Sequence, residues 1–356
     1  YYCHNQHWFS VDHHAKPKLA WIEHIDGVPT RKLADERTQS ITSVFRQIRD
    51  EIKQLPDSNH VTQDYCTRFS GILIVDAKYV KVRGYPKKIA FIYAVDYLTH
   101  DIVCSLLAPT ENYQVYYWFF SLLKRAKYPL RIAVADDNGA AKPALMRVYP
   151  KVKMQLCQNH YIENIRRVLC VRTETEHQVF FYKLKEMVFD QHVNFARLRG
   201  VLHYLMKRFA LTDIKRNQIL HDIYDRREEL FAYTAVPRCP KNTNLIELYN
   251  SHLNGRLKTI KGFKSFQSAK LWLNAYVLRR RTKSFTDCRG KFRGLNGRCS
   301  FEMTINTHAE WPDILGIPDE RELHRVIHKP LKIAARPVAV RSDASPSQKS
   351  AEPALG

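Results

Sequence analysis

The hydrophobic pattern in the first half of the chain consists of short apolar runs that end at carboxylates or turns. A continuous apolar run covers residues 72–75 and ends on Asp76. This run is too short to cross a membrane and is rich in β-branched residues, so it predicts a buried strand. Two further runs end at Asp96 and near Leu107, and the short links between them predict antiparallel neighbours. An acid at the edge of a core is costly unless it is neutralised, for example by a metal ion.

Helical and strand-like periods alternate after the third run. Residues 112–127 carry aromatic and leucine side chains at helical spacing, and a fourth run over residues 130–135 is followed directly by Asp136. A helix, a fifth apolar run and another helix come next. This order predicts an RNase H-like α/β fold that begins with residues 66–170, a mixed sheet flanked by helices. In such a fold the first and fourth strands are neighbours, so Asp76 and Asp136 should lie close together.

The alternation then stops. Residues 171–235 are charged, nearly free of glycine and carry apolar residues at helical spacing, which predicts an all-helical insertion. Residues 236–285 complete the core with a long helix that opens near Asn244 and carries Glu247 on its first turn. A carboxylate there either caps the helix through its dipole or serves as a third metal ligand beside the two aspartates.

Residues 18–56 have the pattern of three short helices. The first ends at Gly27, and the second begins near Thr30. Ser40 caps the third helix, whose core positions are Ile41, Val44, Ile48 and Ile52. A tight turn before the last helix predicts a helix-turn-helix that binds DNA. The alternative is a helical domain that only packs, because basic and acidic residues nearly balance in this segment.

The early residues of the last helix face the DNA in a helix-turn-helix. We therefore expect Thr42, Ser43 and Arg46 at base edges and Arg49 nearer to a phosphate. The sequence Leu55-Pro56-Asp57 ends this helix and predicts the start of a linker.

The first seventeen residues are a polar stretch with candidate zinc ligands. These are Cys3, His4, His7, His13 and His14. They could form the remaining half of a zinc ribbon, although Gln6 stands where a second cysteine would complete a Cys-x-x-Cys pair. The chain starts with Tyr1 rather than Met, so we expect upstream sequence that could supply the other ligands.

Composition points to a polyanionic partner. The 356 residues carry a net charge of +22, which favours nucleic acid. The eight cysteines form no Cys-x-x-Cys pair, as is typical of a reducing compartment. No apolar run reaches the ~18 residues that span a bilayer, so we expect no membrane association.

The positive charge is concentrated late in the chain. Residues 255–298 contain thirteen Lys or Arg and only one acid, Asp287. A phosphate-binding surface is therefore expected along this segment. Its members would be Lys258, Lys261, Lys264, Arg279, Arg280, Arg281 and Lys283. We expect residues 286–334 to form a basic extension and residues 335–356, rich in Pro, Ser and Ala, to form a disordered tail.

Three motifs together resemble the DDE transposases of the Mutator-like superfamily, which includes insertion-sequence transposases with an RNase H-like catalytic core. The first motif is Asp76 in DAKYVKVRG. The second is Asp136, a Tyr-Pro step ending at Pro150, and a Cys-x-x-His pair in QLCQNHYIEN, namely Cys157 and His160. The third is Glu247 in TNLIELYN, followed by a Gly-Phe segment. Each motif alone is weak, but their order and spacing match the family over residues 66–285.

The resemblance implies a triad of Asp76, Asp136 and Glu247 that holds two Mg²⁺ or Mn²⁺ ions, hard cations that prefer oxygen ligands. Asp76 would bridge both ions, and each of the other acids would complete one site. Asp137 competes with Asp136, which follows the strand directly and fits the family spacing. The Cys157–His160 pair would support the active site, contact DNA or only pack. Asp96 and Glu111 are rival carboxylates.

The function implied is metal-dependent DNA cleavage and strand transfer at the ends of a mobile element. The partners would be double-stranded DNA, both the terminal inverted repeats and the target, and further copies of the chain in a homodimer or higher oligomer. Two alternatives stay open: a transposase-derived DNA-binding protein without catalysis, and an RNase H-like nuclease. The location would be the cytoplasm or nucleoid of a prokaryote, or the nucleus of a eukaryote.

Overall fold

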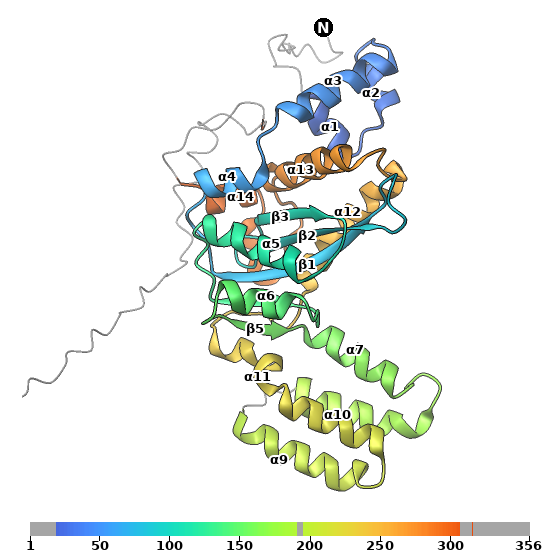
Figure 1. The fold of residues 1–356 in the computed structure, drawn as a ribbon, viewed down its shortest axis with the longest axis vertical. Coiled ribbons are helices and arrows are strands. Elements are labelled where there is room, and N and C mark those ends of the chain that lie inside the picture. The colour runs from blue at the N-terminus through green and yellow to red at the C-terminus, as the bar shows by residue number, and fades with distance from the viewer. Residues whose placement is uncertain (1–18, 191–194, 307–314, 316–356) are drawn as a thin grey trace, which may run out of the picture. The chain divides into compact units, whose positions relative to one another are not determined.

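A mixed five-stranded sheet is the centre of the fold (Figure 1). The computed structural model describes residues 19–190, 195–306 and 315. The predicted zinc ligands of residues 1–17, most of the predicted basic extension and the predicted tail lie outside these residues. The strands are β1 (Ile72–Val80), β2 (Ile89–Asp96), β3 (Ile102–Ala108), β4 (Ile132–Ala135) and β5 (Lys153–Leu156). Their order in the sheet is β3-β2-β1-β4-β5.

The pairing of β1 brings two sequence-distant segments together. β1 is antiparallel to β2 and parallel to β4, and Ile74 lies opposite Val134. Asp76 lies two residues after Ile74, and Asp136 lies two residues after Val134. Parallel strands run in register, so both acids come to the same edge of the sheet. The structure confirms the RNase H-like α/β fold, including the predicted neighbourhood of the first and fourth strands.

Both faces of the sheet are covered, because side chains alternate along a strand. Leu73 and Val75 belong to one hydrophobic cluster, and Ile72 and Ile74 belong to the other. The first cluster includes helices α5 (Tyr113–Arg125), α6 (Ala141–Val148) and α7 (Gln158–Val168). The second includes α12 (Asn244–Ile260) and α13 (Phe266–Thr282). Burial on both faces explains why the strands are continuous apolar runs.

All the described secondary-structure elements within residues 175–235 are helices. The helices are α8 (Gln178–Leu184), α9 (Phe195–Leu205), α10 (Ile214–Asp225) and α11 (Arg227–Leu230), joined by short 3₁₀ and π segments. Apolar side chains of this segment, among them Phe180 and Ile223, continue the cluster on the α5 side of the sheet. None of the helices in the described residues is both long and apolar enough to cross a bilayer.

The amino-terminal helices are α1 (Ala20–Asp26), α2 (Thr30–Glu36) and α3 (Ile41–Gln54). The Ser40 side chain accepts a hydrogen bond from the Ser43 N–H, 3.0 Å away, and so caps α3. Val44, Ile48 and Ile52 are buried as predicted. The prediction for Ile41 is wrong: this first residue of α3 precedes the buried residues of the helix and is 48% exposed. α1 and α3 pack on α13.

The predicted linker after Pro56 is instead a helix, α4 (Ser58–Tyr65). The Asp57 side chain caps it by accepting from the Asn59 N–H. The Asn59 amide then pairs with the backbone of Ser105 on the edge strand β3, with both distances at 2.9 Å. Asn59 thereby supplies the hydrogen-bond partners that a neighbouring strand would give to the N–H and C=O of Ser105. Helix α4 covers this part of the edge strand β3.

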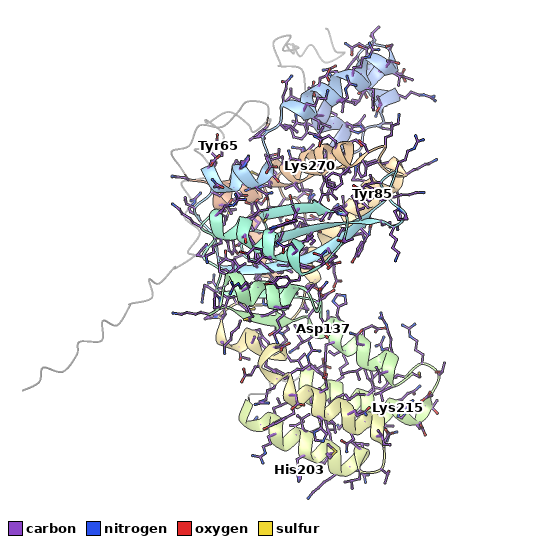
Figure 2. All side chains as sticks on the ribbon, viewed as in Figure 1. Tyr65, Tyr85, Asp137, His203, Lys215 and Lys270 are labelled. Atoms are coloured by element: carbon purple, nitrogen blue, oxygen red, sulfur yellow. The ribbon has the colours of Figure 1, made fainter. Side chains whose placement is uncertain are left out.

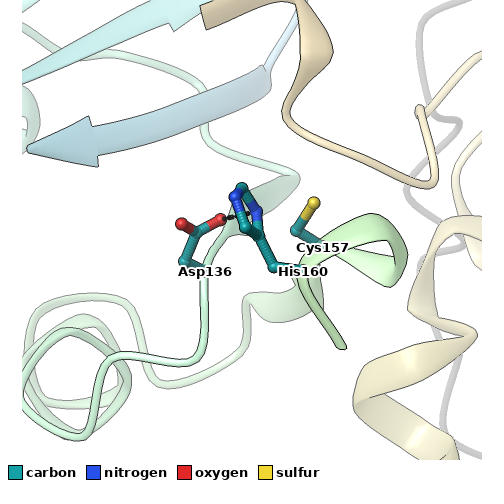
Figure 3. A group of neighbouring side chains, drawn as sticks. All are labelled: Asp136, Cys157 and His160. Atoms are coloured by element: carbon teal, nitrogen blue, oxygen red, sulfur yellow. Dashed lines mark ion pairs between the residues drawn. The ribbon is translucent and has the colours of Figure 1, made fainter. Parts of the chain in front are cut away.

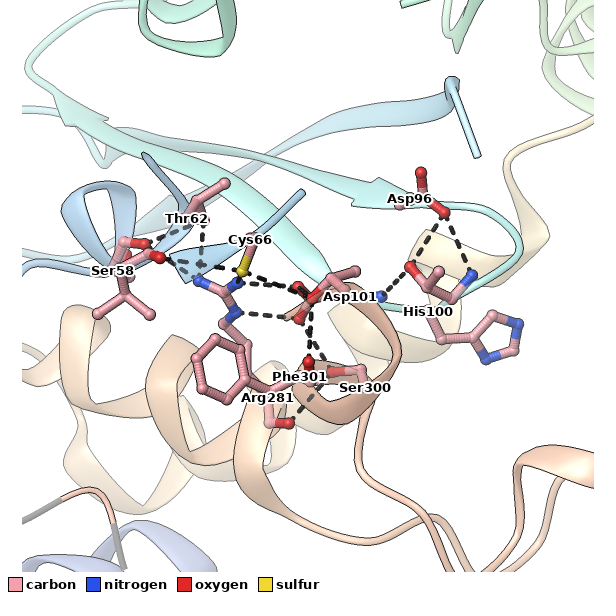
Figure 4. Close-up of polar contacts among 12 residues, drawn as sticks. Ser58, Thr62, Cys66, Asp96, His100, Asp101, Arg281, Ser300 and Phe301 are labelled. Atoms are coloured by element: carbon pink, nitrogen blue, oxygen red, sulfur yellow. Dashed lines mark hydrogen bonds and ion pairs between the residues drawn. The ribbon is translucent and has the colours of Figure 1, made fainter. Parts of the chain in front are cut away.

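Arg281 does not belong to a phosphate-binding surface, contrary to the sequence-based prediction. Its side chain is 1% exposed and forms two hydrogen bonds with Asp101, at 2.9 and 2.8 Å (Figure 4). Arg281 also donates to the Thr62 hydroxyl, and Asp101 accepts from Ser300 and Thr304. A buried charge needs a partner and satisfied hydrogen bonds. The pair therefore links α13 to α4, to the β2–β3 turn and to the short helix α14 (Ser300–Thr304).

Candidate active site

Three acids predicted from the sequence come to one region at the sheet edge. Asp76 lies in β1, Asp136 follows β4, and Glu247 is on the first turn of α12. α12 packs against β1, which brings Glu247 to the edge where the two strands carry their aspartates. Sheet pairing and helix packing thus join residues that are far apart in the chain.

Asp76 is held between β1 and α12. Its Oδ1 accepts from the Ala77 N–H at 2.7 Å, and its Oδ2 accepts from the Asn250 amide at 2.5 Å. The Asn250 carbonyl oxygen accepts in turn from the Tyr93 hydroxyl at 2.9 Å. Burial raises the pKa of Asp76 to about 6, and the nearby charge of Asp136 adds to the effect. The ionised form of this carboxylate is therefore disfavoured mainly because it is buried.

His160 lies between the other two acids. Its Nδ1 is 2.7 Å from Asp136 Oδ1 (Figure 3), and its Nε2 is 3.8 Å from Glu247 Oε1. Burial raises the pKa of Asp136, while His160 acts in the opposite direction. The ring is thus at hydrogen-bond distance from Asp136 and within ion-pair distance of Glu247. Of the roles left open for His160, the geometry favours support of the acids.

Cys157 is buried and holds the start of α12. The Thr243 hydroxyl and N–H lie 3.2 and 3.4 Å from its sulfur. The same hydroxyl is 3.3 Å from Glu247 Oε1 and 3.5 Å from Asp136 Oδ1. Thr243 and Asn250 were not singled out from the sequence. Both stand in the TNLIELYN motif around Glu247, which was the signal available.

Asp137, the rival of Asp136, has a different partner. Both of its oxygens accept from the Arg226 guanidinium, at 2.6 and 2.7 Å. Figure 2 shows Asp137 between the sheet and the helices that follow α7. The hydrogen bond from Arg226 lowers the pKa of Asp137. Asp137 is thus paired with the Arg226 side chain, whereas Asp136 contacts His160 and Thr243.

The other rival carboxylates also have structural partners. Asp96 is fully buried and accepts from Ser70, Thr99 and Tyr128. Glu111 accepts from Tyr79, Tyr116 and Asn138, and Asn138 lies two residues after Asp136. Asp96 therefore orders the turn after β2. Glu111 ties β1 to the loop that carries Asp136.

A second group of metal-ligand residue types lies in the helical segment. It consists of Glu174, Glu176 and His177. The Arg216 Nε donates to His177 Nδ1 at 3.1 Å, so the ring proton is on Nε2, which lies 3.2 Å from Glu174. Both ring nitrogens are used, so the ring has no lone pair for an ion. This group is a hydrogen-bonded cluster rather than a metal site.

The residues predicted to bind DNA differ in their accessibility. Thr42, Ser43, Arg46 and Arg49 are exposed on α3, and Lys258, Lys261 and Lys264 are exposed on and after α12. Arg279 forms an ion pair with Asp26 of α1 at 2.6 Å, and Arg280 lies over the Tyr249 ring. The three lysines thus remain as a basic row, while the two arginines contribute to packing.

The fold and its acids define the class: an RNase H-like protein with one carboxylate midway along its first strand, one directly after its fourth strand and one on the first turn of α12. The sequence profile described as "Transposase, Mutator family" matches residues 38–286, which is most of the chain. The chain belongs to the Mutator family of transposases, proteins that cut and transfer DNA and therefore bind it. A comparison with curated proteins found no match.

Proposed function

We propose that this transposase is a DDE enzyme that cleaves DNA strands at the ends of a mobile element and joins them to a target. The observation that carries the proposal is the meeting of Asp136 and Glu247 at His160, with Asp76 at the same sheet edge. These acids are separated by 60 residues (136 minus 76) and 111 residues (247 minus 136).

The residues at this edge fit two divalent cations. Carboxylate oxygens are the donors that Mg²⁺ and Mn²⁺ prefer, and burial together with the nearby Asp136 raises the pKa of Asp76, a cost of ionisation that a bound cation would offset. Asp76, Asp136 and Glu247 are the residues that would hold the ions. When bound, such ions activate the attacking oxygen and stabilise the leaving oxygen in an in-line displacement at phosphorus.

The surrounding residues keep the acids in place. Asn250 fixes one oxygen of Asp76, and His160 orients Asp136. The Thr243 hydroxyl has one proton to donate and lies within reach of Asp136, Glu247 and the Cys157 sulfur, so it can donate to one of the two carboxylates at a time. Outer contacts of this kind orient metal ligands in other sites and are needed for full activity.

We propose that α3 recognises the element ends, with Thr42, Ser43 and Arg46 at base edges. The exposed Lys258, Lys261 and Lys264 lie at and after the carboxyl end of α12, about 16 Å along the helix from Glu247, and would hold phosphates of the same DNA at a distance from the acids. Pairing two ends would require two copies of the chain.

The test is a strand-transfer assay on duplexes that carry the element's ends, in Mg²⁺ or Mn²⁺. Asp76→Ala, Asp136→Ala and Glu247→Ala should each reduce joining by about 1000-fold while DNA binding persists. Asp64→Ala, which removes an exposed carboxylate on α4, is the control and should keep the parent's activity.

Three outcomes would contradict the proposal. Equal joining by all variants would exclude the triad. Cutting without joining by the parent would favour a nuclease. End-specific binding without cutting in either metal would favour a DNA-binding protein that lacks catalysis.

A further inference from the structure

Two large apolar side chains lie exposed at the start of α3. Ile41 is 48% exposed and Phe45 is 54% exposed, although Val44, Ile48 and Ile52 of the same helix are buried. Ile41 and Phe45 are four residues apart, so they are neighbours on the helix surface. Single exposed apolar residues are ordinary, but an adjacent pair on a helix predicted to contact DNA suggests a binding role.

The surroundings of this pair favour a polyanion. Phe45 is three residues after Thr42 and four before Arg49, so both border it on the helix surface. Thr42, Arg46 and Arg49 are all exposed. No acidic residue occurs between Glu36 and Asp50, and Asp50 forms an exposed ion pair with Arg49, at 3.3 Å, of the weak kind that a DNA phosphate can replace. The apolar pair is thus set within polar and positively charged side chains, which complement a phosphate backbone.

The major groove of DNA offers an apolar group beside its phosphates. The 5-methyl group of thymine projects into that groove, and apolar side chains contact it there. We propose that Phe45, with Ile41 beside it, contacts thymine methyl groups and makes α3 select thymine at one or two positions of its site. This inference rests on the proposed role of α3 in end recognition and adds the chemistry by which it discriminates between bases.

The experiment uses the full chain and the duplex that it selects from a randomised pool. Each thymine of that duplex is replaced in turn by uracil, which lacks only the methyl group. At one or two positions the parent should bind about fourfold more weakly, the value expected for one buried methyl group. Phe45→Ala should bind the thymine and uracil duplexes equally at those positions, and Phe45→Leu should keep part of the preference.

Val179→Ala is the matched control, because Val179 is 67% exposed on α8, away from the predicted DNA-binding helix. It should discriminate between thymine and uracil as the parent does. Phe45 is more than half exposed, so Phe45→Ala should unfold at the parent's temperature, which separates a lost contact from a lost fold.

Two results would overturn the inference while leaving end recognition intact. One is a parent that selects a site but binds every uracil duplex as tightly as the original. The other is a Phe45→Ala protein with the parent's full preference, including one whose only change is in self-association. A parent that selects no sequence would refute both this inference and the proposed role of α3, and the strand-transfer assay would still judge the acids separately.

Discussion

At the scale of single residues, Asp76 shows the tension between stability and the proposed chemistry. Its carboxylate is largely buried, and its hydrogen bonds come from Ala77 and Asn250, which are both neutral donors. Asp136, another acid, is its main charged neighbour. An ionised Asp76 therefore costs stability until a cation binds.

This cost predicts a pH-dependent effect of Asp76→Asn when a chelator removes divalent ions. The folded-state pKa of about 6 exceeds the ordinary 3.8, so the folded protein binds the proton more tightly than the unfolded chain does. The free-energy cost of ionising Asp76 in the folded protein is absent below pH 3.8 and fully present above about pH 6. At neutral pH the variant should be more stable than the parent by about 1–3 kcal/mol, and below pH ~4 the two should converge.

Urea unfolding across this pH range measures the difference. Asp64→Asn, at an exposed position, should show no such trend. If the difference in unfolding free energy between the parent and Asp76→Asn stayed constant with pH, the pKa of Asp76 would not be raised in the folded protein. Added Mg²⁺ should stabilise the parent but not the variant at neutral pH.

Arg281 gives a second prediction at this scale. Arg281→Met would leave Asp101 buried without its counter-charge, which should cost about 3–5 kcal/mol of unfolding free energy. Arg279→Met breaks a more exposed pair with Asp26 and should cost only about 0–1 kcal/mol. Urea unfolding of both variants is the measurement. A stable Arg281→Met protein with weakened DNA binding would instead support the phosphate contact predicted from the sequence.

At the scale of elements, α12 is the helix that completes the site. Thr243 precedes it, Glu247 is on its first turn, and Asn250 follows three residues later, so all three face the sheet edge. The link from Thr243 to the buried Cys157 sets the position of this helix start. α12 thus delivers one acid and the neutral groups that orient two others.

This arrangement predicts that Thr243 is a positioning residue. Thr243→Val keeps the shape but loses the hydroxyl, so strand joining should fall about 10–100-fold with DNA affinity unchanged. Thr243→Ser should keep most of the activity. Initial rates and binding curves on the same duplex distinguish the two effects. Full activity in Thr243→Val, or equal loss in Thr243→Ser, would contradict this role.

Regular elements were predictable from the sequence because apolar periodicity is a local property. The apolar runs before Asp76 and Asp136 predicted their strands and the RNase H-like order. The burial of Arg281 was not predictable, because it depends on Asp101, 180 residues earlier. The exposure of Ile41 was not predictable for a related reason. Helical spacing predicts which face of α3 turns toward the core, but not how far along the helix the core reaches.

At the scale of the whole molecule, the site exists only in the completed fold. Parallel pairing of β1 with β4 joins two acids, and packing of α12 beside β1 adds the third. The family motifs in the sequence indicate the same three acids. They did not give the roles of Thr243 and Asn250, which follow from distances between side chains.

We propose that Asp136, and not its neighbour Asp137, is the second acid of the triad. The test is Mg²⁺-dependent strand joining by Asp136→Asn and Asp137→Asn, measured side by side. Asp136→Asn should lose joining by about 1000-fold, since a neutral amide is a poor ligand for a hard cation. Asp137→Asn, which weakens only the pair with Arg226, should stay within a few-fold of the parent. An inactive Asp137→Asn protein beside an active Asp136→Asn protein would contradict the assignment.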